Sequence, residues 1–302
     1  MKLLILQRSI YEKIILQTIS GGYDSTYLLI KNLKEGHDVH PVFIFSRSVN
    51  PLKQSIEYHA VKKLMKKLQC FDNLHGLTET EINLNNIQGL FSTQPILWLF
   101  GLFNEVMNIR HFIDFDEVHL GYVMTDGAVS FLPEIMKYWK ILFSFSLPEY
   151  KAPKLVFPLM KYHKTTILDK LDDFDREILD DCWFCENPKV IKIKNVKNGD
   201  KEIYLEACCE CHPCTRIKNT HNNKFNALKK YKAKFCYTDF YNGLEKAVKI
   251  IEKDKRLYNI PCNYLTVEEI DEKTIKKLER FKETEKPSKI LKHIKKTTQT
   301  LS

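Results

Sequence analysis

The sequence predicts an α/β fold in which a parallel sheet carries helices on both faces. Residues 13–19 read as a short apolar strand that runs into a glycine-rich turn, and helical spacing of apolar residues begins at Thr26. A second strand is expected at Asp38–Ser46 and a second helix at Gln54–Leu68. Strands that alternate with helices of this length are typical of βαβ units, whose strands pair in parallel.

The glycine-rich turn is a candidate anion site, because it joins a strand to the start of a helix. Glycines let the backbone approach a phosphate, and the helix N-terminus offers N–H groups and the positive end of the dipole. The Walker pattern is absent, and an ordinary tight turn is the alternative. Asp24 is unusual beside a phosphate, so it is expected to hold the loop in shape or to lie near a metal ion. The residues predicted to contact the nucleotide are Ile19, Ser20, Gly21, Gly22, Tyr23, Asp24, Ser25 and Thr26.

Further candidates follow from the ends of the other strands. A buried helix is expected at Thr93–Ile109 and a third strand at Glu117–Val123. Thr125 and Asp126 come next, either as ligand contacts or as a turn closed by Asp-Gly. Sites in parallel sheets gather at the carboxyl ends of the strands. The second strand should therefore bring Phe45, Ser46 and Arg47 near the glycine-rich turn. The buried helix should place in the core Trp98, Phe100 and Phe103.

Length and composition favour a protein of one large domain or two ordinary ones. The chain has 302 residues, of which 44% are hydrophobic. No run of 18 apolar residues occurs, so no membrane span is expected. The first residues turn polar too soon for a signal peptide. These features predict a cytoplasmic location, and a homodimer is compatible with them.

The charge balance raises the question of a nucleic-acid partner. The net charge is +9, and lysines are dense in residues 224–234 and 286–296 of the last third. A basic face there would bind nucleic acid. The alternative is a solvated helical surface. Helices are expected at residues 242–255 and 267–285.

The cysteines are clustered rather than spread. Six of the nine fall between Cys182 and Cys214, which in a cytosolic chain favours a metal over disulfides. The stretches 190–196 and 201–207 between them alternate like two strands of a hairpin, with a turn at 198–200. Two cysteine knuckles beside a hairpin are typical of a structural zinc site. An iron–sulfur cluster or a redox pair stays open, because spacing alone does not determine the metal.

Two motifs together resemble a known family. Ser-Gly-Gly-x-Asp-Ser-Thr at residues 20–26 resembles the PP-loop of the ATP-pyrophosphatases. Pro-Leu-x4-Lys at 158–164, aromatic-x-Cys at 183–185 and the cysteine run at 208–214 then follow in the order found in 7-cyano-7-deazaguanine synthase, the nitrile-forming enzyme of queuosine biosynthesis. The resemblance implies an adenine nucleotide alpha hydrolase-like fold with a zinc-binding lobe. The zinc ligands that it implies are Cys185, Cys208, Cys211 and Cys214.

The resemblance also implies a reaction that uses ATP and Mg²⁺. A carboxylate is a poor electrophile until it is transferred to AMP, after which ammonia attacks to give an amide, and a second dehydration gives the nitrile. The implied partners are a 7-carboxy-7-deazaguanine-type carboxylate and ammonia. Lys164, at the start of a predicted helix, would neutralise developing charge. The catalytic residues that follow from this are Asp24, Ser25 and Lys164.

Departures from the family pattern keep other functions open. Residues 46–50 replace the family's Gly-Gln, Cys209 replaces a glycine of the cysteine motif, and Cys182 is an additional thiol. Two alternatives follow: a PP-loop enzyme that modifies tRNA by thiolation, or a nucleotide-binding component of a defence assembly without catalysis.

The motifs divide the chain into three expected parts. A PP-loop nucleotide-binding domain is expected at residues 1–175, and a cysteine-rich zinc-binding lobe at 176–220. The third part, residues 221–302, is expected to be a helical, lysine-rich extension.

Overall fold

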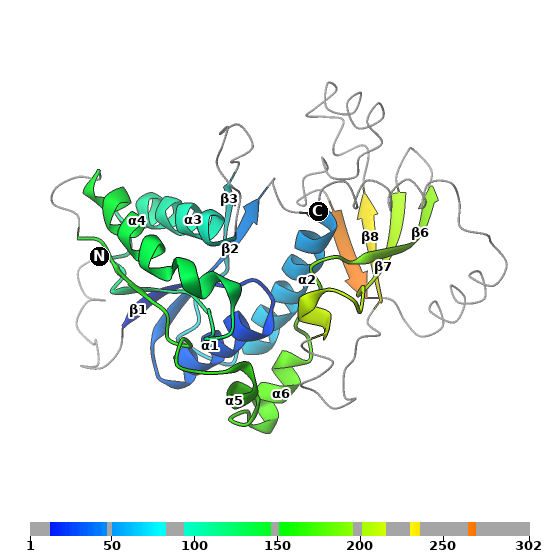
Figure 1. The fold of residues 1–302 in the computed structure, drawn as a ribbon, viewed down its shortest axis with the longest axis horizontal. Coiled ribbons are helices and arrows are strands. Elements are labelled where there is room, and N and C mark those ends of the chain that lie inside the picture. Colours follow the sequence, from blue (N-terminus) through cyan, green and yellow to red (C-terminus); the bar gives the residue numbers. More distant parts are fainter. Residues whose placement is uncertain are drawn as a thin grey trace, which may run out of the picture.

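The computed structural model contains two sheets that lie side by side (Figure 1). One has five parallel strands and the other has four antiparallel strands. The residues that the structure describes are 13–46, 50–82, 94–145, 151–195, 201–215, 230–235 and 265–269.

The parallel sheet has the strand order β3-β2-β1-β4-β5, so the order of strands reverses between β1 and β4. Such a reversal opens a crevice at the carboxyl ends of the strands, where ligands bind in open α/β sheets. The strands are β1 (Ile14–Thr18), β2 (Asp38–Ser46), β3 (Thr78–Ile82), β4 (Glu117–His119) and β5 (Lys154–Val156).

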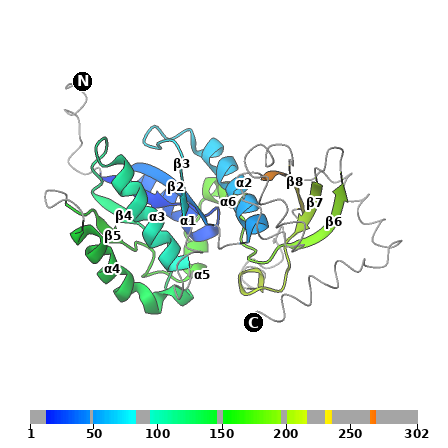
Figure 2. The same cartoon turned by 90° about the horizontal axis from the view of Figure 1, so that it is seen from above.

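Helices cover both faces of this sheet, as the sequence predicts (Figure 2). One core cluster joins α1, α2 and α6 to β2, and a second joins α3 and α4 to all five strands. None of the described helices is long and apolar enough to cross a membrane. The helices are α1 (Tyr23–Lys34), α2 (Pro51–Leu68), α3 (Gln94–Ile109), the 3-10 turn η1 (Gly127–Phe131), α4 (Leu132–Ser144), α5 (Lys164–Leu168) and α6 (Asp173–Leu179).

Element boundaries differ from the predictions where capping decides them. α1 begins at Tyr23, because Gly22 is its N-cap, rather than at Thr26. α2 begins at Pro51, because the Asn50 side chain caps it by accepting from the N–H groups of the next residues. The short edge strand β3 is not predicted, since alternating exposed glutamates hide its apolar positions.

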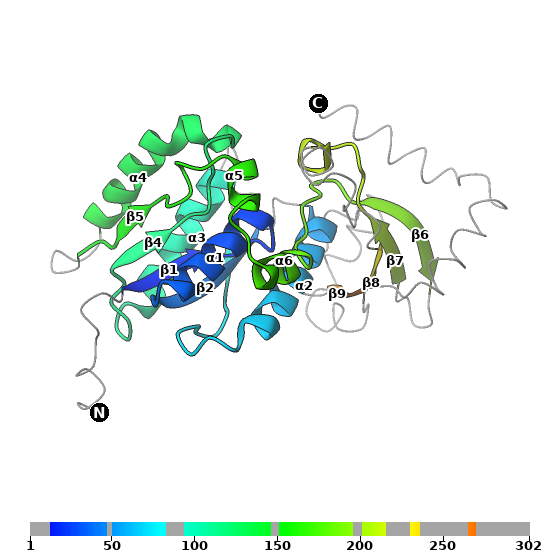
Figure 3. The same cartoon turned by 90° about the horizontal axis from the view of Figure 1, so that it is seen from below.

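The second sheet extends the predicted hairpin (Figure 3). β6 (Lys189–Asn195) and β7 (Lys201–Glu206) pair antiparallel, which confirms the hairpin, while the turn at 198–200 lies outside the described residues. β8 (Lys230–Phe235) and β9 (Leu265–Glu269) then pair beyond β7 in the order β6-β7-β8-β9.

The strands β8 and β9 correct the expectation of an all-helical extension from residue 221. The helix predicted from residue 267 is wrong over 267–269, which belong to β9. The edge of β7 leaves backbone groups that a further strand satisfies, and a pattern within one segment does not reveal that pairing. The predicted helix at 242–255 and residues 270–285 lie outside the described part.

Candidate functional site

The glycine-rich loop passes from β1 to α1 through a tight space. Gly21 has φ of +71°, which favours glycine, and a Cβ there would lie 2.7 Å from the carbonyl oxygen of Glu57 in α2. On the other side, a Cβ on Gly121 would lie 3.0 Å from the Cα of Ser25. Gly121 therefore forms part of the site, and it was not predicted from the sequence. A glycine inside the strand predicted over residues 117–123 was the one indication that another backbone approaches there.

Hydroxyl groups shape the inside of the loop. The Ser25 Oγ accepts from the backbone N–H of Ser20 at 3.2 Å and donates to the Gly22 carbonyl at 3.2 Å. The Ser20 and Ser25 hydroxyls lie 3.1 Å apart. Gly22 is the N-cap of α1 and has no side chain with which to cap this helix. The positive end of the helix dipole lies at this terminus, which suits it to an anion.

A lysine from a distant segment reaches the start of α1. The Lys164 Nζ lies 2.7 Å from the Asp24 Oδ2, and both side chains are about four-fifths buried. Lys164 is the first residue of α5. The segment before α5 is hydrogen-bonded to the segment that follows β4, where the Met124 N–H donates to the Tyr162 carbonyl at 3.1 Å. The predicted catalytic residues Asp24, Ser25 and Lys164 therefore come together around one helix terminus.

A chain of buried hydrogen bonds connects the loop to β1, α1 and β4. Gln17 donates to the carbonyl oxygen of Ser25 at 2.8 Å and accepts from Asn32 at 2.8 Å. Asn32 lies 3.0 Å from the Nδ1 of His119, whose Nε2 lies 2.9 Å from Glu117. Burial lowers the pKa of His119, which keeps the ring neutral. Sequence reasoning missed this chain, because its members come from three elements that only folding brings together.

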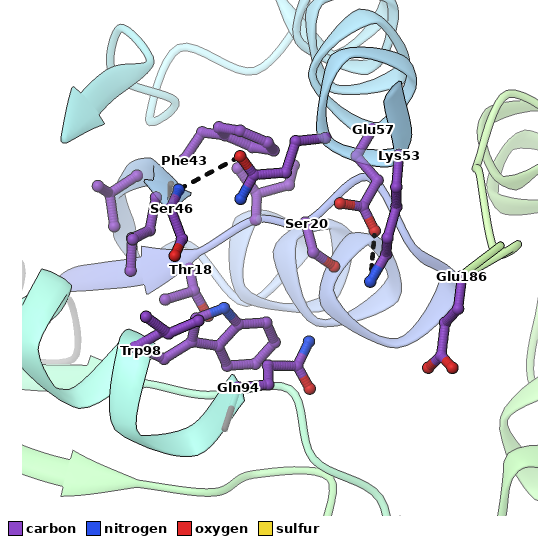
Figure 4. A pocket seen from close by; sticks show the side chains of 14 residues that line it. Thr18, Ser20, Phe43, Ser46, Lys53, Glu57, Gln94, Trp98 and Glu186 are labelled. Carbon is purple, nitrogen blue, oxygen red and sulfur yellow. Dashed lines mark hydrogen bonds and ion pairs between the residues drawn. The ribbon is translucent and has the colours of Figure 1, made fainter. Parts of the chain in front are cut away.

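A pocket opens beside the loop, where residues of α2 and α3 meet the ends of β1 and β2 (Figure 4). Its volume is about 150 Å³. The Thr18 side chain is 2% exposed, and its Oγ1 has no hydrogen-bond partner among the described residues. The residues that line the pocket include Thr18, Ser20, Ser46, Glu57, Gln94 and Trp98.

An ion pair and the cysteine lobe form the polar side of the pocket. The Lys53 Nζ lies 3.5 Å from Glu57, one turn further along α2. Burial raises the pKa of the Glu57 carboxyl against the effect of Lys53. Attraction by Glu57 outweighs burial and raises the pKa of Lys53. Glu186 reaches the same pocket from the cysteine-rich segment.

The other predicted contacts divide between the site and the framework. Ser46 lines the pocket, as expected, whereas Phe45 packs in the core and Arg47 lies outside the described residues. Asp126 closes the turn after β4, since its carboxylate accepts from the Val123 N–H at 2.9 Å. Thr125 is exposed. The three aromatic residues of α3 pack against the core, as expected, although Trp98 also faces the pocket.

The cysteine cluster brings together the four cysteines that the resemblance implies. The sulfur atoms of Cys185, Cys208, Cys211 and Cys214 all lie within 4.8 Å of one another. A tetrahedral ion with Zn–S bonds of about 2.3 Å places its sulfurs about 3.8 Å apart. The Cys208 and Cys214 sulfurs are 3.8 Å apart. The four cysteines of a [4Fe-4S] cluster bind four different irons and lie further apart, so this spacing fits ligands that share a single ion.

Backbone N–H groups stabilise the thiolate form of Cys208. Burial raises the pKa of this thiol, but donation from the N–H groups of Glu210 and Cys211 outweighs it and the pKa falls to about 7. Cys182 and Cys209 lie nearby in the sequence but are not part of this group of four cysteines. The Cys182 sulfur lies 3.4 Å from the Thr26 hydroxyl, and Cys209 points its sulfur to the Ala207 carbonyl.

Cys209 has φ of +60°, the conformation that glycine adopts most easily. The resemblance places a glycine at this position, and the backbone explains that preference. The cysteine side chain replaces the glycine without joining the cluster.

Comparisons with known proteins add two structures. No protein-family model matches the sequence, and no curated protein matches it. The U34-tRNA thiolase NcsA from Methanococcus maripaludis, with its [4Fe-4S] cluster, is 15% identical with a TM-score of 0.33, over 56% of this chain and 64% of that chain. A 4-thiouridine synthetase in complex with RNA and ATP is 14% identical with a TM-score of 0.39, over 86% of this chain and 55% of that chain. The chain thus spans less than two thirds of either protein.

Proposed function

We propose that this protein is an enzyme that binds ATP at the glycine-rich loop and uses it to adenylate a carboxylate. The observation that carries the proposal is the position of Lys164, held by Asp24 at the N-terminus of α1. Positive charge, helix N–H groups and two hydroxyls converge there. Such groups stabilise the negative charge that develops during phosphate transfer.

The pocket offers a place for the nucleoside of ATP. Ser20 belongs to both the loop and the pocket, so the two sites adjoin each other. One ligand could therefore place its phosphates at the loop and its nucleoside in the pocket. The Trp98 ring provides an apolar surface, and the Thr18 hydroxyl would find its hydrogen-bond partner in a polar edge of the ligand. A buried hydroxyl without a partner costs stability, so its retention supports a ligand-binding role.

The reaction proceeds by two nucleophilic displacements. A carboxylate oxygen attacks the α-phosphorus of ATP, pyrophosphate leaves, and an acyl-adenylate forms. Ammonia then attacks the carbonyl carbon, AMP leaves with the carboxylate oxygen, and the amide forms after loss of a proton. For a nitrile, the amide oxygen attacks the α-phosphorus of a second ATP, pyrophosphate leaves and the amide nitrogen loses one proton. AMP then leaves with the amide oxygen as the nitrogen loses its second proton and the C≡N bond forms. Mg²⁺ bound with the nucleotide would screen phosphate charge.

The residues around the loop have distinct parts in this scheme. The N–H groups of α1 and the hydroxyls of Ser20 and Ser25 would bind the phosphates, and Gly21 would allow the close approach. Asp24 holds Lys164 before the nucleotide arrives. Lys164 would then move its charge toward the oxygens of the α-phosphate and the leaving pyrophosphate.

The acid that we propose is of the 7-carboxy-7-deazaguanine type, with ammonia as the nitrogen source. The four cysteines would hold one Zn²⁺, which is structural because four thiolates leave no open position. The sequence resemblance supports the substrate, and the spacing of the four sulfurs supports the single ion.

A product assay tests the reaction. Purified protein would be incubated with ATP, Mg²⁺, ammonium and 7-carboxy-7-deazaguanine, and AMP and the amide or nitrile would be measured by mass spectrometry. The matched control is Lys164→Ala, which should form little AMP. Formation of AMP without an amide or nitrile would agree with the proposed adenylation but would contradict the proposed substrate.

Two other outcomes would favour the rival functions. A sulfur-labelled tRNA product, with iron in the purified protein, would replace the ligase by a thiolation enzyme. Tight ATP binding without turnover of any acid or tRNA would favour a non-catalytic nucleotide-binding role.

A further inference from the structure

The segment that leads into the cysteine cluster passes along the glycine-rich loop. The Trp183 N–H donates to the carbonyl oxygen of Gly21 at 2.8 Å. One residue earlier, the Cys182 sulfur lies 3.4 Å from the Thr26 hydroxyl. Trp183, Cys182 and Thr26 are all at least nine-tenths buried. This contact joins two motifs that lie far apart in the sequence.

The hydrogen bond from Trp183 sets the direction of one peptide unit. In a trans peptide the C=O and the following N–H point in opposite directions. With the Gly21 carbonyl turned toward Trp183, the Gly22 N–H points to the other side, where it lies 3.4 Å from the Ser20 hydroxyl oxygen. A flipped peptide would instead direct a carbonyl oxygen at the candidate anion site and repel a phosphate.

The cysteine cluster holds the other end of the same segment. The Trp183 Nε1 donates to the Cys185 carbonyl at 2.8 Å, and the Cys185 sulfur accepts from the Cys208 N–H at 3.2 Å. Trp183 is therefore fixed between the loop and a proposed metal ligand. A metal that gathers the four sulfurs would restrict this segment further, because Cys185 would gain a bond to the ion.

We propose that Trp183 is a positioning residue whose backbone N–H, held in place by the cysteine cluster, aims the Gly21–Gly22 peptide at the phosphates of ATP. A metal in the cluster then raises the affinity of the loop for ATP without touching it. The inference rests on the proposed function, because ATP is the ligand. It adds a link between two sites that the proposed reaction treats separately.

Two substitutions of one residue separate the backbone contact from the ring. Trp183→Pro removes the N–H together with the ring. Trp183→Phe keeps the N–H and the backbone link to Cys185, and loses the indole donor and part of the buried ring. Calorimetry with ATP and Mg²⁺ should give about tenfold weaker binding for Trp183→Pro and a change below about threefold for Trp183→Phe. Metal content and circular dichroism should match the wild type in both.

The wild-type chain supplies a second measurement that needs no folded proline variant. Removing the metal with a chelator should weaken ATP binding about tenfold and speed hydrogen exchange of the amides in residues 19–26. Re-adding zinc should restore both. Equal ATP affinity with and without the metal would overturn the inference and leave the proposed function standing. A metal-loaded wild type that binds no ATP would overturn both.

Discussion

Lys164 and Asp24 stand 140 residues apart in the sequence and meet at 2.7 Å at the N-terminus of α1. Because the carboxylate lies in the first turn, it neutralises the lysine and also interacts favourably with the helix dipole. A phosphate that enters the site competes with Asp24 for Lys164. In the proposed function, the pair would keep the charge of Lys164 in place before the nucleotide arrives.

Replacement of Lys164 should affect turnover more than binding. Lys164→Ala is expected to lower the rate of AMP formation by about 10²–10³, since it removes one charge aimed at the transition state, with less than about tenfold loss of ATP affinity. Rates from AMP quantification and affinities from calorimetry separate the two. The control is Lys161→Ala, an exposed lysine of the same segment. An equal loss of affinity and rate in Lys164→Ala would assign the lysine to binding alone.

Gly21 should tolerate no side chain. Gly21→Ala combines a positive φ with a Cβ placed 2.7 Å from the Glu57 carbonyl oxygen, so we expect about 1–3 kcal/mol less stability and loss of ATP binding. Urea unfolding and calorimetry measure the two effects. Gly127→Ala is the matched control, because the described part of the chain, apart from the residues adjacent to Gly127, places no atom within 4 Å of its added Cβ. Wild-type behaviour of Gly21→Ala would show that the loop geometry is not required.

The Thr18 hydroxyl should matter to the ligand rather than to the fold. Thr18→Val removes a buried oxygen without a partner among the described residues, so stability should stay unchanged or rise by up to about 1 kcal/mol. ATP affinity should fall about twofold to tenfold, the effect of one hydrogen bond. Thr125→Val, at an exposed threonine near the same end of the sheet, should change neither. Unchanged ATP affinity in Thr18→Val would remove the pocket from the nucleotide site.

The cysteine cluster should hold one zinc per chain. Cys208→Ser is expected to lose the metal and to destabilise the lobe, as measured by elemental analysis and thermal unfolding. Cys209→Gly is the control, because its sulfur lies outside the cluster and its φ of +60° suits glycine. That variant should keep the zinc and gain about 1 kcal/mol of stability. Visible absorption from iron in the wild type would contradict the single-zinc interpretation.

Stability should fall below neutral pH through His40. Burial and then the neighbouring His75 ring lower the pKa of His40 to about 4, from 6.5 in the unfolded chain. The unfolded state therefore binds more protons, and the stabilisation that is complete above pH 6.5 declines as the pH falls toward 4. We expect a loss of roughly 1–3 kcal/mol across this range in urea unfolding.

A substitution identifies His40 as the source of this loss. His40→Gln should flatten the decline between pH 6.5 and 4, whereas substitution of the exposed His111 by glutamine should leave it unchanged. Other groups would be responsible if the two variants lose stability in parallel with the wild type.

The fold class and three of the five strands of the parallel sheet, β1, β2 and β4, could be predicted from local patterns in the sequence, and the family resemblance implied the four clustered cysteines. Apolar runs indicate β1 and β2, and Cys-x2-Cys spacing brings sulfurs together within one short stretch. β3 was not predicted, because its five residues Thr-Glu-Thr-Glu-Ile include two exposed glutamates and one apolar residue. β9 was not predicted, because it is stabilised by pairing with a strand that is distant in the sequence. The roles of Gly121 and Gln17 were not predicted, because both residues contact α1, which is a different element from their own.

The sequence by itself determined that a glycine-rich loop joins a strand to a helix and that Cys208, Cys211 and Cys214 lie close together, since neighbours along the chain create both features. Only the tertiary structure decided that Trp183 joins these two features through Gly21. It also decided that the Thr18 hydroxyl faces a pocket and has no hydrogen-bond partner among the described residues. Such relationships depend on the packing of segments that approach one another only when the chain buries its apolar surface. Local pattern therefore indicates the chemistry, and packing brings its parts into contact.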